Sequence, residues 1–319
     1  MRFEDAYKEY LKFAKKQQKK QSFNTLQYNF DSKILSYFKN YVLDDLTSND
    51  ILSWEEYILS YNYSNNYNRN LYYLLSGFFT FCHIQYGIDK KIISNIGCFK
   101  KRYEEKKTDF YTLKEFRHFI KYVDDEIYKQ FFNLLFFTGV RPGEAMALKF
   151  SDFQGDYLTI NKTIESHGKR EIGTPKTLSS IRKIKIDKFL KKDLLRLKKY
   201  YLERFKVDND SFIFGCVRPL SPTTINRYKL KACIKANIRP ITLHQFRHSH
   251  ATLLLSKGIM INEVSRRLGH SKTSTTLDIY THTNLEQEKR VYNTLCSLRF
   301  NVFSTLQCNF KNLISILKR

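Results

Sequence analysis

Hydrophobic and polar residues follow a helical period over the first third of the chain. Two runs spaced three and four residues apart are Tyr7, Tyr10, Leu11 and Ala14, and Ile34, Tyr37, Phe38 and Tyr41. A helix places residues at this spacing on one face, so each run predicts an amphipathic helix. Thr47-Ser48-Asn49-Asp50 predicts a helix start, because such side chains accept the N–H groups of a first turn. We therefore predict a small helical bundle over residues 1–98.

A different pattern begins after a run of charges. Residues 99–110 are rich in Lys, Arg and Glu, which predicts an extended linker between two domains. Thr112 and Glu115 then have the spacing of a capping box, so a helix is expected to restart there. Between Tyr157 and Ile186 the β-branched residues alternate and are interrupted by glycines and a proline, which predicts a small hairpin sheet. Helical patterns resume after this sheet.

These patterns together predict a mainly α fold with two domains. The length of 319 residues agrees with this, at ~150 residues per domain. The second domain, residues 111–285, is expected to combine helices with the small antiparallel sheet. Residues 286–319 form a C-terminal tail with apolar positions, and two interpretations stay open for it: a helix packed on its own domain, or a contact with a neighbouring protomer.

The charge balance indicates the kind of partner. Lys and Arg number 55 against 31 for Asp and Glu, which gives a formal net charge of +24. An excess of this size favours a polyanionic partner, nucleic acid first and an acidic membrane surface second. Hydrophobic residues make up 42% of the chain and aromatic residues 15%, which excludes a disordered basic tail protein.

Other features bear on membranes, metals and the redox environment. Residues 71–88 carry no formal charge, but Ser76, His83 and Gln85 interrupt them, so they predict a buried helix rather than a membrane span. Acidic residues at the start of the chain are unlike a signal peptide. The six cysteines contain no C-x-x-C pair, which argues against a zinc site and a compact disulfide framework. We expect reduced thiols and a cytoplasmic protein.

An arginine and a glutamate stand at the start of one predicted helix. Arg141 precedes Pro142, a residue that suits the first helical position, and a helix start attracts phosphate. Glu144 follows three residues later, where its carboxylate could orient the guanidinium. An ordinary surface cap with an ion-paired glutamate explains the same residues, so both interpretations stay open at this point.

A second polar cluster lies about a hundred residues further on. His244 and Arg247 are three residues apart and share one helix face. An imidazole beside a guanidinium is a poor pair for a protein core, because the two repel each other when the imidazole is protonated. The same pair can bind a negatively charged oxygen well. The neighbouring His248 and His250 are expected to be structural.

Four short strings, taken in order, resemble the tyrosine recombinases, the phage-integrase family. They are T-G-V-R-P-G-E with Arg141, H-Q-F-R-H with His244 and Arg247, L-G-H with His270, and I-Y-T-H with Tyr280. The resemblance covers residues 108–285, and the first domain resembles the family's SAM-like core-binding domain. It implies that the second domain has the mixed α/β DNA breaking-rejoining fold of the family.

The resemblance also implies a chemistry. Tyr280 would attack a DNA phosphodiester, form a 3′-phosphotyrosyl link and expel a 5′-hydroxyl. Arg141 and Arg247 would hold the phosphate oxygens as their charge grows, without a metal or another cofactor. His244 would accept the tyrosine proton, and His270 would donate a hydrogen bond to the same phosphate.

The resemblance further implies a lysine on the hairpin sheet that protonates the leaving 5′-oxygen. Lys176, in the string Gly173-Thr174-Pro175-Lys176-Thr177, matches this position. The same sheet also contains Lys162, Lys169, Lys183 and Lys185, any of which could be a solvated charge or the true proton donor. The assignment to Lys176 is therefore an expectation.

The implied partners are those of a strand-exchange enzyme. They are double-stranded DNA with specific core sites, further copies of the chain in a homotetramer on paired sites, and optionally a directionality or accessory DNA-bending factor, with no membrane partner. Four lysines at the end of the opening helix are candidates for phosphate contacts, against the alternative of a merely solvated helix end. They are Lys15, Lys16, Lys19 and Lys20.

Two other functions stay open on a similar scaffold, and a third is disfavoured. One is a recombinase of the same family that resolves chromosome dimers or inverts DNA, and a second is a relaxing enzyme of the type IB topoisomerase kind. The third is a DNA-binding protein that has lost catalysis, which disagrees with the complete set of site residues. An integrase of a phage or another mobile element is the function we favour.

Overall fold

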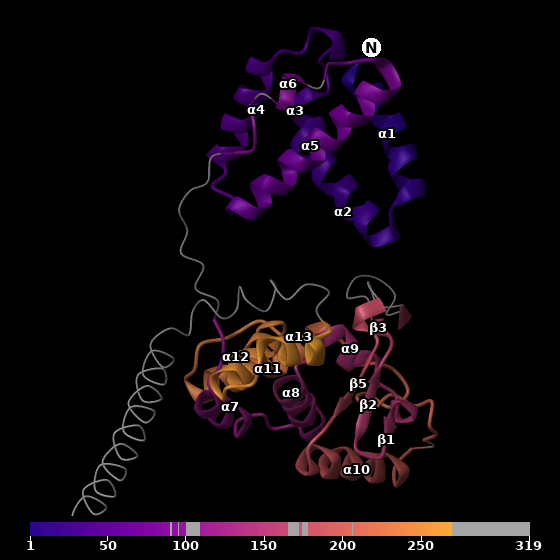
Figure 1. Cartoon of the computed structure of the whole chain (residues 1–319), viewed down its shortest axis with the longest axis vertical. Helices are drawn as coiled ribbons and strands as arrows, with labels where there is room; N and C mark the ends of the chain where they lie inside the picture. The colour runs from indigo at the N-terminus through magenta and orange to yellow at the C-terminus, as the bar shows by residue number, and fades with distance from the viewer. Residues whose placement is uncertain are drawn as a thin grey trace, which may run out of the picture. The chain divides into compact units, whose positions relative to one another are not determined.

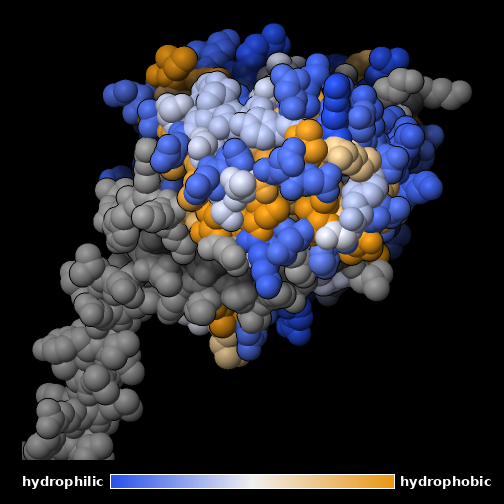
Figure 2. All heavy atoms as spheres, turned by 90° about the horizontal axis from the view of Figure 1, so that it is seen from above, coloured by the Kyte–Doolittle hydropathy of each residue, from blue (hydrophilic) through white to orange (hydrophobic). Residues whose placement is uncertain are grey.

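The computed structural model describes residues 1–89, 91–94, 96–99, 109–164, 172–173, 178–205 and 207–269. The chain divides into two compact units, Met1–Lys106 and Lys107–Arg319 (Figure 1). The boundary between the units falls within the segment 99–110, which the sequence predicts to be a linker. On the face seen in Figure 2, hydrophilic side chains surround a smaller hydrophobic area, in keeping with the large excess of Lys and Arg.

The first unit is a bundle of helices. They are α1 (Phe3–Gln17), α2 (Lys20–Phe30), a π-helical turn (Asp31–Leu35), α3 (Ser36–Phe38), a 3-10 turn (Leu43–Asp45), α4 (Ser48–Ser60), α5 (Asn65–Tyr86) and α6 (Lys91–Ser94). The helix start predicted at Thr47-Ser48-Asn49-Asp50 is the start of α4, where Thr47 and Asp50 form a capping box. No described helix is long and apolar enough to cross a bilayer, and most of the uncharged segment 71–88 lies in α5.

Aromatic side chains fill the core of this first unit. Phe3 is fully buried, and its ring lies 5.2 Å from that of Phe38 and 4.6 Å from that of Phe78. The indole Nε1 of Trp54 donates a hydrogen bond to the Lys33 carbonyl oxygen at 2.9 Å, which ties α4 to the π-helical turn. The lysines proposed for DNA contact lie at the end of α1 and the start of α2, and all four are exposed.

The second unit combines seven helices within its described part with short strands. The helices are α7 (Leu113–Ile120), α8 (Glu126–Thr138), α9 (Pro142–Ala147), α10 (Lys188–Leu202), α11 (Pro222–Ala236), α12 (Gln245–Ser256) and α13 (Ile261–Leu268). Thr112 and Glu115 form the predicted capping box of α7. Figure 1 shows the strands gathered at one side of the unit and α7, α8, α11, α12 and α13 at the other.

The strands form two small antiparallel sheets, where the sequence predicts one. A three-stranded sheet has the order β1-β2-β5, and a ribbon pairs β3 with β4. Their bounds are β1 (Phe153–Gln154), β2 (Tyr157–Ile160), β3 (Thr163–Ile164), β4 (Ile172–Gly173) and β5 (Arg182–Lys185). The ribbon packs closely on α9. A Cβ added at Gly143 of α9 would lie only 2.6 Å from Thr163 Oγ1 of β3, so there is no room for a larger side chain.

A second aromatic core places α12, the helix that carries Arg247. Phe246 is fully buried between α7 and α8, with its ring 5.8 Å from that of Phe119 and 5.5 Å from that of Phe132. Next to it, the rings of Phe116 and Phe136 stack at 3.8 Å. Because Phe246 and Arg247 are adjacent, burial of the phenyl ring fixes the position from which the guanidinium extends.

Candidate active site

Arg141 stands at the N-terminal end of α9, with Pro142 as the first helical residue. The Glu144 carboxylate accepts hydrogen bonds from the Arg141 backbone N–H and from Arg141 Nη1, both at 2.8 Å. The side chain of Arg141 is 36% exposed, whereas that of Glu144 is 3% exposed. The guanidinium is therefore held from the inner side by a buried carboxylate while it still reaches the surface.

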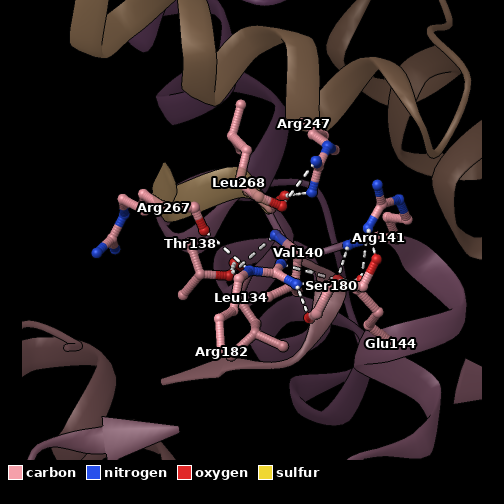
Figure 3. A network of polar contacts seen from close by, with 11 residues as sticks. Leu134, Thr138, Val140, Arg141, Glu144, Ser180, Arg182, Arg247, Arg267 and Leu268 are labelled. Carbon is pink, nitrogen blue, oxygen red and sulfur yellow. Dashed lines mark hydrogen bonds and ion pairs between the residues drawn. The ribbon is translucent and has the colours of Figure 1, made fainter. Parts of the chain in front are cut away.

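Glu144 has a second guanidinium partner that the sequence analysis missed. Arg182 of β5 donates from Nη2 to Glu144 Oε2 at 2.9 Å and from Nη1 to Oε1 at 3.2 Å (Figure 3). The sequence does contain a signal for this arrangement. Period-two alternation puts Arg182 on the same face as the buried Ile184, where a charged residue needs a partner.

Two opposing effects set the pKa of Glu144. Burial by itself raises the pKa of a carboxyl, because it disfavours the charged form. The hydrogen bonds and positive charge of Arg182, followed by the hydrogen bonds from Arg141, outweigh burial, and the net pKa lies below the usual value. Glu144 is therefore ionised at neutral pH.

Arg247 is buried and bonded to the main chain. Its Nη1 donates to the Gly139 carbonyl oxygen at 2.9 Å, and its Nη2 donates to that of Leu268 at 2.8 Å (Figure 3). Gly139 has a φ of 68°, and a Cβ there would lie 2.6 Å from Leu268 Cδ2, so glycine is required. Arg247 thus joins the end of α8 to the end of α13 through two of its five N–H donors.

The arginines of this cluster repel one another. The pKa of Arg247 is lowered, first by burial and next by the positive charge of Arg141, while Glu144 acts in the opposite direction. Arg247 nevertheless stays protonated, since a guanidinium does not lose its proton at neutral pH. One carboxylate compensates only part of the charge of Arg141, Arg182 and Arg247, so the cluster favours a further anion.

His244 precedes α12 and is neutral at pH 7. Partial burial and then the charges of His248, Arg247 and Arg141 lower its pKa to about 4. A neutral imidazole can accept a proton. His250 has a structural place, as expected: its Nδ1 lies 2.8 Å from the Phe136 carbonyl oxygen, and its Nε2 accepts a hydrogen bond from Arg267 Nε at 3.2 Å.

The turn at the end of α13 packs against the segment that leads into β5. Gly269 has a φ of 71°, and a Cβ there would lie 2.9 Å from the Ser179 carbonyl oxygen and 3.1 Å from Arg182 Cδ. His270 follows this turn directly in the sequence, but His270, Tyr280 and Lys176 all lie outside the described residues. The structure therefore brings together Arg141, Glu144, His244 and Arg247, and adds Arg182 to them.

The other candidate lysines of the sheet have different surroundings. Lys162 Nζ forms an ion pair with Asp152 at 2.7 Å. Lys183 and Lys185 are exposed on β5, and Lys169 lies outside the described residues. Within the described ranges, no group of three or more His, Cys, Asp or Glu residues is arranged to hold a metal ion.

Two family models match the chain. Residues 108–287 match the phage integrase family, and residues 2–58 match the phage integrase N-terminal SAM-like domain. The ICEBs1 integrase of Bacillus subtilis is 29% identical over 91% of this chain and 81% of the relative. The integrase of Staphylococcus phage L54a is 31% identical over about half of each protein, 48% of this chain and 47% of the relative.

Solved structures show the same fold. A lambda integrase dimer bound to a COC′ core site superposes with a TM-score of 0.71 at 17% identity, over 89% of this chain and 97% of that one. The Tn1549 transposon integrase in complex with transposon right end DNA gives 0.73 at 17% identity, over 93% and 100%. The mainly helical architecture with a SAM-like first domain is thereby confirmed. The chain belongs to the phage integrase family and is a tyrosine-type site-specific DNA recombinase.

Proposed function

We propose that Tyr280 of this recombinase cuts DNA by forming a 3′-phosphotyrosyl link in the site built around Arg141 and Arg247. The supporting observation is the cationic cluster itself, in which one buried carboxylate is shared by more than one guanidinium. A DNA phosphodiester supplies the missing negative charge, and attack on it increases that charge on the non-bridging oxygens. Guanidinium groups fixed in advance stabilise this increase without a metal ion.

His244 and Lys176 would move the protons of the reaction. A tyrosine hydroxyl has a pKa of ~10 and is a weak nucleophile at neutral pH, so a proton acceptor is needed. His244 is neutral before DNA binds, and the negative phosphate would make it a better base. Lys176 would give a proton to the leaving 5′-oxygen, and His270 would donate a hydrogen bond to the phosphate.

The biological role that we propose is integration or excision of a mobile element. The ICEBs1 integrase, 29% identical, matches over 91% of this chain, whereas the XerC recombinase of Staphylococcus aureus, 27% identical, matches over 73%. A lambda integrase tetramer bound to a Holliday junction is among the similar solved structures. We infer a homotetramer on paired core sites in the cytoplasm, with a directionality or DNA-bending factor as a further partner.

The domain roles follow from this proposal. Residues 1–98 would bind the core site, residues 111–285 would cut it, and the linker 99–110 would let both units close round the duplex. The tail 286–319 would contact a neighbouring protomer in the tetramer. Exposed Lys15, Lys16, Lys19 and Lys20 would bind DNA phosphates from the first unit.

Replacing the proposed nucleophile tests the function directly. Tyr280→Phe removes only the hydroxyl, so covalent protein–DNA adducts should disappear while the dissociation constant for DNA stays within about 3-fold, a change of under ~1 kcal/mol. The substrate is a nicked suicide duplex made from the DNA that flanks the gene, and adducts are read on a denaturing gel. Tyr292→Phe is the matched control and should still form adducts. Adducts in the Tyr280→Phe variant would show that another residue is the nucleophile.

A sulfur-substituted substrate tests the proton donor. Lys176→Ala should cut ordinary DNA slowly but recover on DNA whose 5′-bridging oxygen is sulfur, because a thiol with a pKa of ~8.5 leaves without a proton. Arg141→Ala should slow cleavage by about 10²- to 10³-fold and recover much less, since it holds the non-bridging oxygens. Equal recovery of both variants, or of neither, would remove Lys176 from this role and make Lys169 the next candidate.

Salt dependence tests the four lysines of the first unit. Each phosphate contact contributes ~0.9 to the slope of log K against log salt concentration. Changing Lys15, Lys16, Lys19 and Lys20 together to Ala should flatten the slope by up to ~4. A control variant removes the same charge from α10, at Lys188, Lys191, Lys192 and Lys199, and should leave the slope unchanged. A slope unchanged from wild type in the Lys15, Lys16, Lys19 and Lys20 variant would assign these four lysines to solvent.

A further inference from the structure

Arg182 is a buried arginine of the site, and no step of the proposed reaction involves it directly. Its side chain is 8% exposed, and it lies on β5 rather than on a helix that carries a proposed phosphate contact. Main-chain bonds fix it in place: Nε donates to the Arg267 carbonyl oxygen and Nη1 to that of Ser180, both at 2.9 Å. The guanidinium is therefore a rigid support, held by two segments of backbone and directed at Glu144 (Figure 3).

The carboxylate of Glu144 receives four hydrogen bonds, two on each oxygen. Oε1 accepts from Nη1 of Arg141 and Nη1 of Arg182, and Oε2 accepts from the Arg141 backbone N–H and Nη2 of Arg182. A carboxylate has about four lone-pair positions, so this set fills it. Arg182 thereby occupies positions that a second N–H of the Arg141 guanidinium could otherwise take.

The charges lead to the same conclusion. Arg141, Arg182 and Glu144 together carry a net charge of +1. Without Arg182, Arg141 and Glu144 would form a neutral pair. The Arg141 guanidinium would then turn toward the Glu144 carboxylate, because the attraction between opposite charges is strong in a low-dielectric site. An Arg141 held in this way would be displaced from a phosphate and would offer it less charge.

We propose that Arg182 is a positioning residue for strand cleavage: by holding Glu144, it lets the carboxylate orient Arg141 without neutralising it. The inference rests on the proposed role of Arg141 at the phosphate. Arg182 touches neither DNA nor the nucleophile in this account and acts only through Glu144. A misplacement of about 1 Å at a reacting group can cost ~100-fold in rate, which sets the size of effect to expect.

Two substitutions of similar length separate positioning from packing. Arg182→Met keeps an unbranched apolar side chain and removes the charge, whereas Arg182→Lys keeps the charge but loses the two-pronged geometry. Single-turnover cleavage of the nicked suicide duplex should slow ~10- to 100-fold in Arg182→Met and by no more than about 5-fold in Arg182→Lys. The dissociation constant for DNA should stay within about 3-fold in both, so the loss is in the rate and not in binding.

A double substitution tests whether the effect passes through Arg141. In the Arg141→Ala background, Arg182→Met should slow cleavage by less than about 3-fold, because the residue on which it acts is already gone. Arg196→Ala is the control: Arg196 lies on α10, is 67% exposed, and should leave cleavage at the wild-type rate. Circular dichroism and thermal unfolding establish that each variant is folded at the assay temperature.

The outcomes separate this inference from the proposed function. Wild-type cleavage in Arg182→Met, equal slowing in the Lys and Met variants, or the full loss retained in the Arg141→Ala background would each overturn the positioning role. If the wild-type chain forms adducts that depend on Tyr280, the proposed function stands whichever of these results is found. Adducts that do not depend on Tyr280 would contradict the proposed function itself.

Discussion

A single buried carboxylate organises the cations of this site. Glu144 is 3% exposed, and a carboxylate removed from water to that extent stays charged only with partners that replace its hydration. Arg182 and Arg141 supply those partners from two elements far apart in the sequence, β5 and the start of α9. Burial would raise the pKa of the group, and the two arginines more than reverse that effect.

Arg141, Arg182 and Arg247 carry more positive charge than the Glu144 carboxylate compensates, and this excess favours the binding of an anion such as a phosphate group. Arg247 is bonded to carbonyl oxygens at the ends of α8 and α13, which fixes it without neutralising it. The lowered pKa of Arg247 and of His244 both record repulsion within the cluster, in addition to burial. A bound phosphodiester would relieve that repulsion, and would relieve it further as negative charge develops during the proposed attack. Burial, and after it the same positive charges, lower the pKa of His244, so the imidazole is neutral and able to accept a proton.

The features that the sequence predicts correctly depend on residues that lie close together in the chain. Thr47 and Thr112 start helices because a capping box needs only residues three positions apart, and both boxes are present. The motifs that resemble the phage-integrase family likewise lie in short strings, and the family is confirmed. The roles of His270, Tyr280 and Lys176 stay predictions, because these residues lie outside the described part of the chain.

Features that depend on distant contacts could not be predicted. Arg182 is 38 residues from Glu144 in the sequence, so no spacing rule connects them, although strand alternation places its charge on a buried face. Sequence alternation predicts one hairpin sheet, whereas the described strands form two sheets, and β3 of the second sheet packs closely against Gly143 of α9. Both features involve contacts between segments that are distant in the sequence.

The measurement that tests the central claim most directly is the cleavage rate of Glu144→Gln. Glutamine keeps the shape of the side chain and one acceptor oxygen but removes the charge shared by Arg141 and Arg182. If this carboxylate organises the site, single-turnover cleavage of the suicide duplex should fall ~100-fold or more in the folded variant, with DNA binding nearly unchanged. Cleavage at the wild-type rate would contradict the account, since Arg141 would then reach the phosphate without its buried partner.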